Sequence, residues 1–162
     1  MGSAGSLLKL AVRIAKEHKL PPALVCAITE KESSWRPWAI RFEPGYRWLH
    51  LRNDDVPRFP GVTSATELCQ QRTSWGLMQV IGSTARDLGF PGSYMSELCE
   101  PTVGLDYGCR FILSLRERFG ESIPDIISSY NAGHPTQSNQ EEYTTPVLQL
   151  FERFRAEFVN AE

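Results

Sequence analysis

The chain has 162 residues, enough for one domain with a buried core but too few for two ordinary domains. Apolar residues make up 41% and charged residues 22%, which excludes a wholly disordered chain. Seventeen basic and nineteen acidic residues give a net charge of −2, so nucleic acid is not expected as a partner. No apolar run approaches the roughly 18 residues that span a bilayer, so no membrane span is expected.

The first six residues are rich in Gly and Ser and are predicted to be flexible. They are either an expression remnant that replaces a native leader or the true start of a protein exported by another route. The segment that follows is not a signal peptide, because Lys9 and Arg13 interrupt its apolar stretch. One globular domain is expected over residues 7–162.

Helical periodicity dominates the rest of the chain, and Pro21-Pro22, Gly89 and Gly120 mark boundaries. No convincing alternating strand pattern appears, so the predicted fold class is all-α, a compact domain. The predicted helices cover residues 5–18, 22–33, 64–71, a short segment from 84 that ends at 89, about 102–118, a segment that starts after Ser122, and one from 145 to about 158.

Four cysteines stand at positions 26, 69, 99 and 109, and their three possible pairings stay open. A disulfide between Cys99 and Cys109 is favoured, because they flank the start of one predicted helix. The chain has no Cys-x-x-Cys motif and its three histidines are scattered, so no metal site is expected.

Residues 36–63 form a long stretch with little periodicity that is rich in aromatics, including Tyr46 and Trp48. Loops of this length are usually functional or disordered, and the aromatics argue against disorder. The stretch either packs on the core through its own aromatics or forms one wall of a cleft, where aromatic faces carry sugar or peptide ligands.

Glu32 continues the apolar stripe of Val25 and Ile28 on its predicted helix. A carboxyl group there faces the interior or a cleft wall, where desolvation raises its pKa and keeps it protonated, as a general acid requires. The alternative is that the helix ends by Lys31 and that Glu32 turns to solvent.

Three sequence blocks favour a functional role for Glu32 over a solvent-exposed one. They are Glu32-Ser33-Ser34-Trp35, then Ser74-Trp75-Gly76-Leu77-Met78-Gln79, then Ser129-Tyr130-Asn131-Ala132-Gly133. In this order, with Tyr143 ahead of the last helix, they resemble the signature blocks of the soluble lytic transglycosylase catalytic domain, which is lysozyme-like. The resemblance covers about residues 8–158. Ser129 stands where the family pattern has Ala.

The resemblance implies a lysozyme-like fold and a role for each matched residue. Glu32 would be the catalytic acid and base, supported by Ser33, and Tyr130 and Tyr143 would orient its carboxyl group through their hydroxyls. Met78, Gln79 and Asn131 would contact the glycan, and Gly76 and Gly133 would permit a close backbone approach or a left-handed turn. From the long stretch, Glu43, Tyr46 and Trp48 are the candidate substrate-binding residues.

The implied substrate is peptidoglycan, cut at the β-1,4 bond between N-acetylmuramic acid and N-acetylglucosamine to leave a 1,6-anhydromuramoyl end. No cofactor is needed, a monomer is expected, and the site of action is the cell wall, in the periplasm, outside the cell or by phage delivery.

Two alternatives remain open. A second carboxylate facing Glu32, from Glu43, Asp54 or Asp55, would make the enzyme a hydrolase that uses water. A glycan-binding domain of the same fold without catalysis is the other, but a binder has no use for a carboxyl group aimed at a scissile oxygen.

Overall fold

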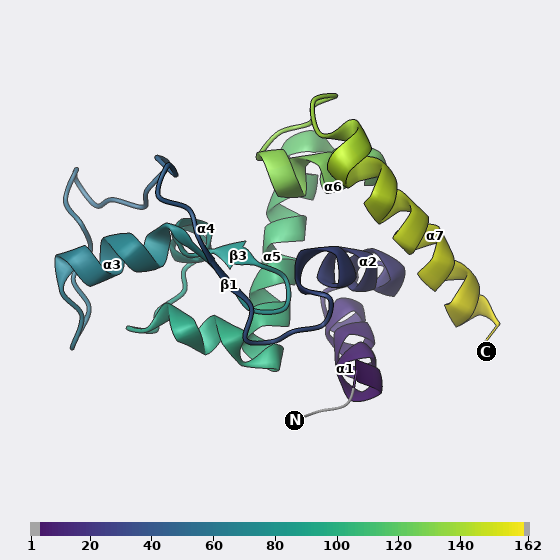
Figure 1. Ribbon diagram of the computed structural model, residues 1–162, viewed down its shortest axis with the longest axis horizontal. Helices are drawn as coiled ribbons and strands as arrows, with labels where there is room; N and C mark the ends of the chain where they lie inside the picture. The colour runs from purple at the N-terminus through teal and green to yellow at the C-terminus, as the bar shows by residue number, and fades with distance from the viewer. Residues whose placement is uncertain (1–3, 161–162) are drawn as a thin grey trace.

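The computed structural model describes residues 4–160 (Figure 1). Seven α-helices, three short strands and two further helical turns account for most of this range. In chain order they are α1 Ala4–Glu17, α2 Pro22–Ser33, β1 Ile40–Phe42, α3 Ser64–Gln71, β2 Thr73–Trp75, β3 Val80–Ile81, α4 Gly82–Asp87, the 3₁₀ turn η1 Met95–Cys99, α5 Pro101–Phe119, α6 Ile123–Ala132, the π-helical turn η2 Gln140–Thr144 and α7 Thr145–Val159.

Helices α1, α2, α6 and α7 form one lobe, and α5 runs between this lobe and the rest of the molecule (Figure 1). Helix α2 lies at the centre of the helical lobe, packed against α1 and α7. Its residues from Ala23 to Thr29 are all buried, which is why the helix has little amphipathic character. Helix α2 is therefore held on several sides, and its C-terminal end is a rigid place for a functional side chain.

The second lobe contains α3, α4 and a three-stranded antiparallel sheet in the order β1-β2-β3. Ile40 pairs with Trp75 and Ser74 pairs with Ile81. The mostly helical fold agrees with the predicted class, but these strands were not predicted. Strands of two and three residues are too short to show an alternating pattern.

Two local predictions are corrected. The four cysteines are free thiols, so the favoured Cys99–Cys109 disulfide is wrong. Cys99 precedes α5, whereas Cys109 lies two turns into that helix and is buried in the core. In addition, α1 already begins at Ala4, so residues 4–6 of the predicted flexible segment are helical, while residues 1–3 lie outside the described range.

Candidate active site

Glu32 lies in the last turn of α2, and the chain turns sharply just after it. Ser34 and Trp35 both adopt left-handed backbone conformations, with φ of +50° and +61°, and the Ser34 amide caps the helix on the Glu30 carbonyl. Burial raises the pKa of Glu32, and the charge of Glu43 adds to this, while a Tyr143 hydrogen bond, Arg41 and Lys31 oppose it. The net shift is upward, which favours the protonated carboxyl group.

Tyr143 is the direct partner of Glu32. Its hydroxyl donates to Glu32 Oε1. Burial and the nearby Glu32 carboxyl raise the pKa of Tyr143 well above its usual value, so the phenol keeps its proton and acts as donor. Lys31 on α2 donates to the Glu142 carbonyl at 2.9 Å, and this bond holds η2, which carries Tyr143, against the end of α2.

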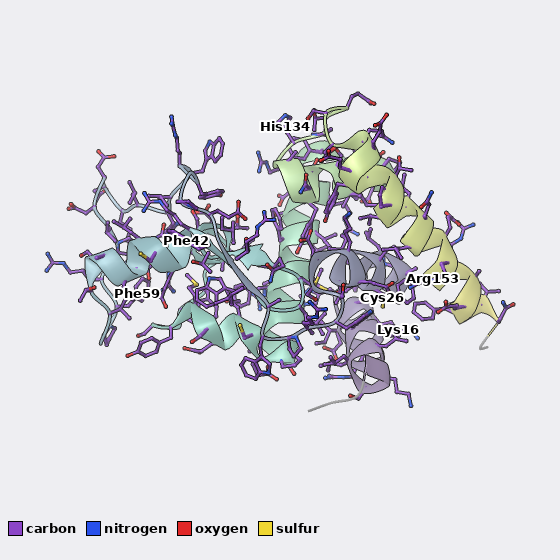
Figure 2. All side chains as sticks on the ribbon, viewed as in Figure 1. Lys16, Cys26, Phe42, Phe59, His134 and Arg153 are labelled. Atoms are coloured by element: carbon purple, nitrogen blue, oxygen red, sulfur yellow. The ribbon has the colours of Figure 1, made fainter. Side chains whose placement is uncertain are left out.

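A cleft of about 680 Å³ lies between the two lobes and includes Glu32 in its lining. Helices α5 and α6 supply one wall, with Phe111 and Leu115 as apolar surface and Tyr130 and Asn131 beside them. The facing wall comes from β1 and the segment that follows it, together with β2, β3 and α4. The remaining lining residues are Arg41, Glu43, Tyr46, Trp48, Ser74, Gln79, Ile81, Thr84, Asp87, Arg118, Ala132, Gly133 and His134. Figure 2 shows His134 beyond α6 and Phe42 on β1, in the two lobes on either side of the cleft.

A second carboxylate, Glu43, also lines the cleft. Its Oε1 accepts hydrogen bonds from Arg41 Nη2 at 3.0 Å, from Arg41 Nε at 3.3 Å and from Ser74 Oγ at 3.1 Å. Its backbone amide donates to the Arg72 carbonyl, which extends the β1–β2 ladder and fixes its position. Asp54 and Asp55 lie elsewhere, in an exposed turn closed by an Arg52–Asp55 bridge.

The predicted groove aromatics Tyr46 and Trp48 both line the cleft, with ring centroids 5.5 Å apart in an edge-on arrangement. Trp48 is 76% exposed, so its ring is open to a ligand. Ser83 Oγ donates to the Trp48 carbonyl at 2.5 Å, and the Gln71 side chain bonds both the amide and the carbonyl of His50. The segment thus presents its aromatics from a fixed backbone.

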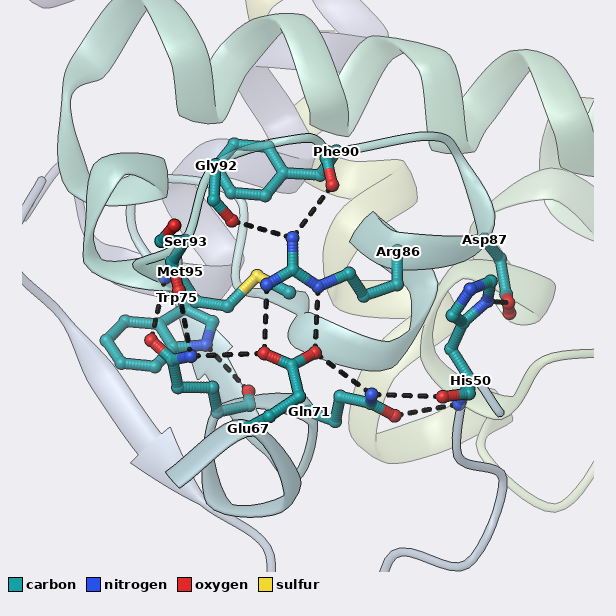
Figure 3. A network of polar contacts seen from close by, with 11 residues as sticks. His50, Glu67, Gln71, Trp75, Arg86, Asp87, Phe90, Gly92, Ser93 and Met95 are labelled. Atoms are coloured by element: carbon teal, nitrogen blue, oxygen red, sulfur yellow. Dashed lines mark hydrogen bonds and ion pairs between the residues drawn. The ribbon is translucent and has the colours of Figure 1, made fainter. Parts of the chain in front are cut away.

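Behind this segment lies a buried polar network (Figure 3). Arg86 bonds both carboxylate oxygens of Glu67, at 2.8 and 2.9 Å, and Gln71 donates to the same carboxylate at 3.0 Å. Arg86 also donates to the carbonyls of Phe90 and Gly92. This network was not predicted from the sequence, although Glu67 and Gln71 lie one turn apart on a short predicted helix.

Two residues with predicted roles at the site turn out differently. Met78 is fully buried, and its thioether occupies the space that a Cβ at Gly108 would need, so its side chain is part of the core and does not line the cleft. The Tyr130 hydroxyl donates to the Met78 carbonyl at 2.8 Å. Of the two tyrosines expected to orient Glu32 through their hydroxyls, Tyr143 therefore donates to Glu32 and Tyr130 donates to Met78.

Ser33 is also directed away from the cleft, because its buried hydroxyl donates to the Thr29 carbonyl on the same helix. Gln79 lines the cleft, but its amide nitrogen donates to the Ala39 and Gly76 carbonyls, both at 2.9 Å, so its carbonyl oxygen is the end left for a ligand. Gly76 has a φ of +71°, and a Cβ there would lie 2.2 Å from the Leu98 carbonyl oxygen.

Gly133 ends α6 in a left-handed conformation. Sequence reasoning gave no role to the cleft residues Ser74, Phe111, Leu115, Arg41 or Arg118. Ser74 stands inside a matched block, and Phe111 and Leu115 are four residues apart on one face of α5, so a role for these three could have been predicted from the sequence. The two arginines carried no such signal.

Among residues 4–160 no group of His, Cys, Asp and Glu side chains could hold a metal ion. In the same range no helix is both long and apolar enough to cross a membrane.

Comparison with known proteins gives one match, to the family model described as the transglycosylase SLT domain, over residues 9–147. Neither the curated proteins nor the solved structures gave a match. The family acts on peptidoglycan of the cell wall. The match covers most of the chain, including Glu32, the cleft walls and Tyr143. The chain therefore belongs to the transglycosylase SLT domain family, with the lysozyme-like, mostly helical fold that its sequence blocks predict.

Proposed function

We propose that the protein is a peptidoglycan lytic transglycosylase that cleaves the β-1,4 bond between N-acetylmuramic acid and N-acetylglucosamine and leaves a 1,6-anhydromuramoyl end. One observation carries the proposal: Glu32 is a desolvated carboxyl group of raised pKa that lines the cleft and accepts a hydrogen bond from Tyr143. The raised pKa favours the protonated form, which a general acid needs in order to donate to a bound substrate.

In this mechanism Glu32 first donates its proton to the glycosidic oxygen as the bond breaks. The N-acetyl oxygen of the same sugar stabilises the positive charge at the anomeric carbon, as in substrate-assisted glycosidases. Glu32 is then ionised, and the hydroxyl of Tyr143 stabilises its negative charge. The carboxylate accepts the proton of the muramoyl 6-hydroxyl, whose oxygen attacks the anomeric carbon and closes the anhydro ring.

The cleft suits a glycan strand. Trp48 and Tyr46 offer aromatic surface for sugar rings, and Asn131 and Gln79 offer amide groups for hydroxyl and acetamido groups. Action on the wall from the periplasm, from outside the cell or by phage delivery follows from this substrate, and a monomer suffices for the reaction.

Glu43 favours a second candidate, a lysozyme-type hydrolase. It lines the same cleft as Glu32, and its Oε1 already accepts bonds from Arg41 and Ser74. Its other oxygen would then be the one to hold a water molecule for attack on the anomeric carbon. The third candidate, a binding domain without catalysis, gives no use to the protonated Glu32.

Glu32→Gln and Glu43→Gln test the assignment on purified peptidoglycan. We expect Glu32→Gln to fold normally and to lose activity by at least 10²–10⁴-fold, roughly the contribution of general acid catalysis. Glu43→Gln should keep most of its turnover. Comparable clearing by Glu32→Gln would contradict the site, and an equal loss in Glu43→Gln would favour the hydrolase.

A further inference from the structure

The side chain of Asn139, in the loop after α6, makes hydrogen bonds back to that helix. Its Nδ2 donates to the Ser128 carbonyl at 3.0 Å and to Asn131 Oδ1 at 3.1 Å. Its Oδ1 accepts from Ser128 Oγ at 2.9 Å and from Thr144 Oγ1 at 3.2 Å. Asn139 thereby links the cleft residue Asn131 to the turn that carries Tyr143.

This network fixes which end of the Asn131 amide faces the cleft. A backbone carbonyl such as Ser128 O only accepts hydrogen bonds, so Asn139 must turn its NH₂ group toward it. The second N–H of Asn139 then donates to Asn131, so the atom of Asn131 that accepts this hydrogen bond must be its side-chain oxygen. The NH₂ group of Asn131 is left, and no side chain or carbonyl within residues 4–160 accepts a hydrogen bond from it.

Asn131 is exposed and lines the cleft, so its NH₂ group is available to a ligand as a hydrogen-bond donor. A donor at this point favours a ligand atom that only accepts. In the glycan of the proposed function the carbonyl oxygen of an N-acetyl group is such an acceptor, whereas a hydroxyl group both donates and accepts.

We infer that Asn139 is a specificity-determining positioning residue, which holds Asn131 as a donor so that the cleft selects an acetamido sugar over one with a hydroxyl group in its place. The inference rests on the proposed function for the class of ligand. It assigns Asn139 a role through Asn131, without contact between Asn139 and the substrate.

The test is the affinity ratio for two neutral tetrasaccharides, tetra-N-acetylchitotetraose and cellotetraose, which differ in whether the C2 position carries acetamido or hydroxyl. Binding is measured by titration calorimetry in the Glu32→Gln background, so that no sugar is cleaved. Asn139→Asp cannot donate, so Asn131 should rotate its NH₂ group toward the new carboxylate and turn its oxygen to the cleft. We expect the preference for the acetylated sugar to fall about tenfold, with cellotetraose affinity little changed.

Gln137→Glu is the matched control, because it makes the same amide-to-acid change on the same exposed loop and should leave the ratio unchanged. Asn131→Asp is the second variant, in case Asn139→Asp does not fold. It removes the donor itself and should reduce the preference in the same way. An unchanged ratio in a folded Asn139→Asp, or in Asn131→Asp if Asn139→Asp does not fold, overturns the inference, as does an equal loss for both sugars.

A failure of the inference is distinguishable from a failure of the proposed function. If the wild-type protein cleaves peptidoglycan and Asn139→Asp keeps the full preference for the acetylated sugar, the proposed function stands and the role of Asn139 is rejected. A Glu32→Gln protein that binds neither tetrasaccharide also contradicts the inference, and the products from peptidoglycan then decide the reaction separately.

Discussion

The Tyr143 hydroxyl donates a hydrogen bond to the Glu32 carboxyl group across 111 residues of sequence. The bond joins the last turn of α2 to the π-helical turn before α7. Helices α2 and α7 pack against each other, so the geometry of the acid depends on the packing of the helical lobe. A change at Tyr143 should therefore be visible in the pH dependence of catalysis.

Tyr143→Phe should move the alkaline limb of the pH–rate profile to higher pH. The protonated form of Glu32 is the acid, so the rate falls as pH rises through the Glu32 pKa. The Tyr143 hydroxyl lowers that pKa by stabilising the ionised form, and its loss lets burial raise the pKa further. The plateau rate should fall about ten- to a hundredfold, because a hydrogen bond to a charged group contributes roughly 1.5–3 kcal/mol. An unshifted limb at unchanged rate would contradict the role.

Tyr130→Phe should behave differently, because the Tyr130 hydroxyl donates its hydrogen bond to the Met78 carbonyl. The variant leaves that buried carbonyl without its donor, which costs about 1–3 kcal/mol of folding free energy. We expect the melting temperature to fall by several degrees and the alkaline limb to stay in place. A limb that shifts as far as in Tyr143→Phe would show that Tyr130 also acts on Glu32.

Arg86→Met should destabilise the protein by about 3–5 kcal/mol, because it leaves the buried Glu67 carboxylate without its cationic partner. The Arg86 and Glu67 side chains are 2% and 1% exposed. Arg13→Met is the control, since the Arg13–Glu17 pair is exposed and such pairs contribute about 0–1 kcal/mol. Chemical denaturation measures both. Equal midpoints in the two variants would contradict a stabilising role for the network.

Ser129→Ala should stabilise the protein. The Ser129 hydroxyl is fully buried and has no hydrogen-bond partner in the described part of the chain, and an unsatisfied polar group costs about 1–3 kcal/mol. Ser128→Ala is the natural contrast, because the Ser128 hydroxyl lies within hydrogen-bond distance of the Thr136 carbonyl and of Asn139 Oδ1, so its loss should destabilise the protein. A lower denaturation midpoint for Ser129→Ala than for wild type would contradict this account of the hydroxyl.

Several residues that line the cleft could be predicted from the sequence because their signals are local. The helix predicted over residues 22–33, which carries Glu32, has the same bounds as α2. The apolar stripe that ends at Glu32 lies within this one helix, so it is visible in the local sequence. The aromatic stretch of residues 36–63 also contributes Tyr46 and Trp48 to the cleft.

The errors at Met78 and Tyr130 concern contacts between distant segments. The Met78 side chain points into the core because Gly108, thirty residues later, leaves space for it. The hydrogen bond of the Tyr130 hydroxyl depends on where the fold places the Met78 carbonyl. The pairing of Glu67 with Arg86 is a contact of the same kind. Local spacing cannot show that a carboxylate has a partner 19 residues away.

The masses of the products from purified peptidoglycan test the central claim most directly. The muramoyl 6-hydroxyl is tethered to the reacting sugar, and well-oriented tethered groups reach effective molarities of roughly 10⁵–10⁸ M, far above that of water. We therefore predict that mass spectrometry finds muropeptides ending in 1,6-anhydromuramic acid, one water lighter than the hydrolytic products. Hydrated reducing ends as the main species would contradict the account and would assign Glu43 the role of holding the attacking water.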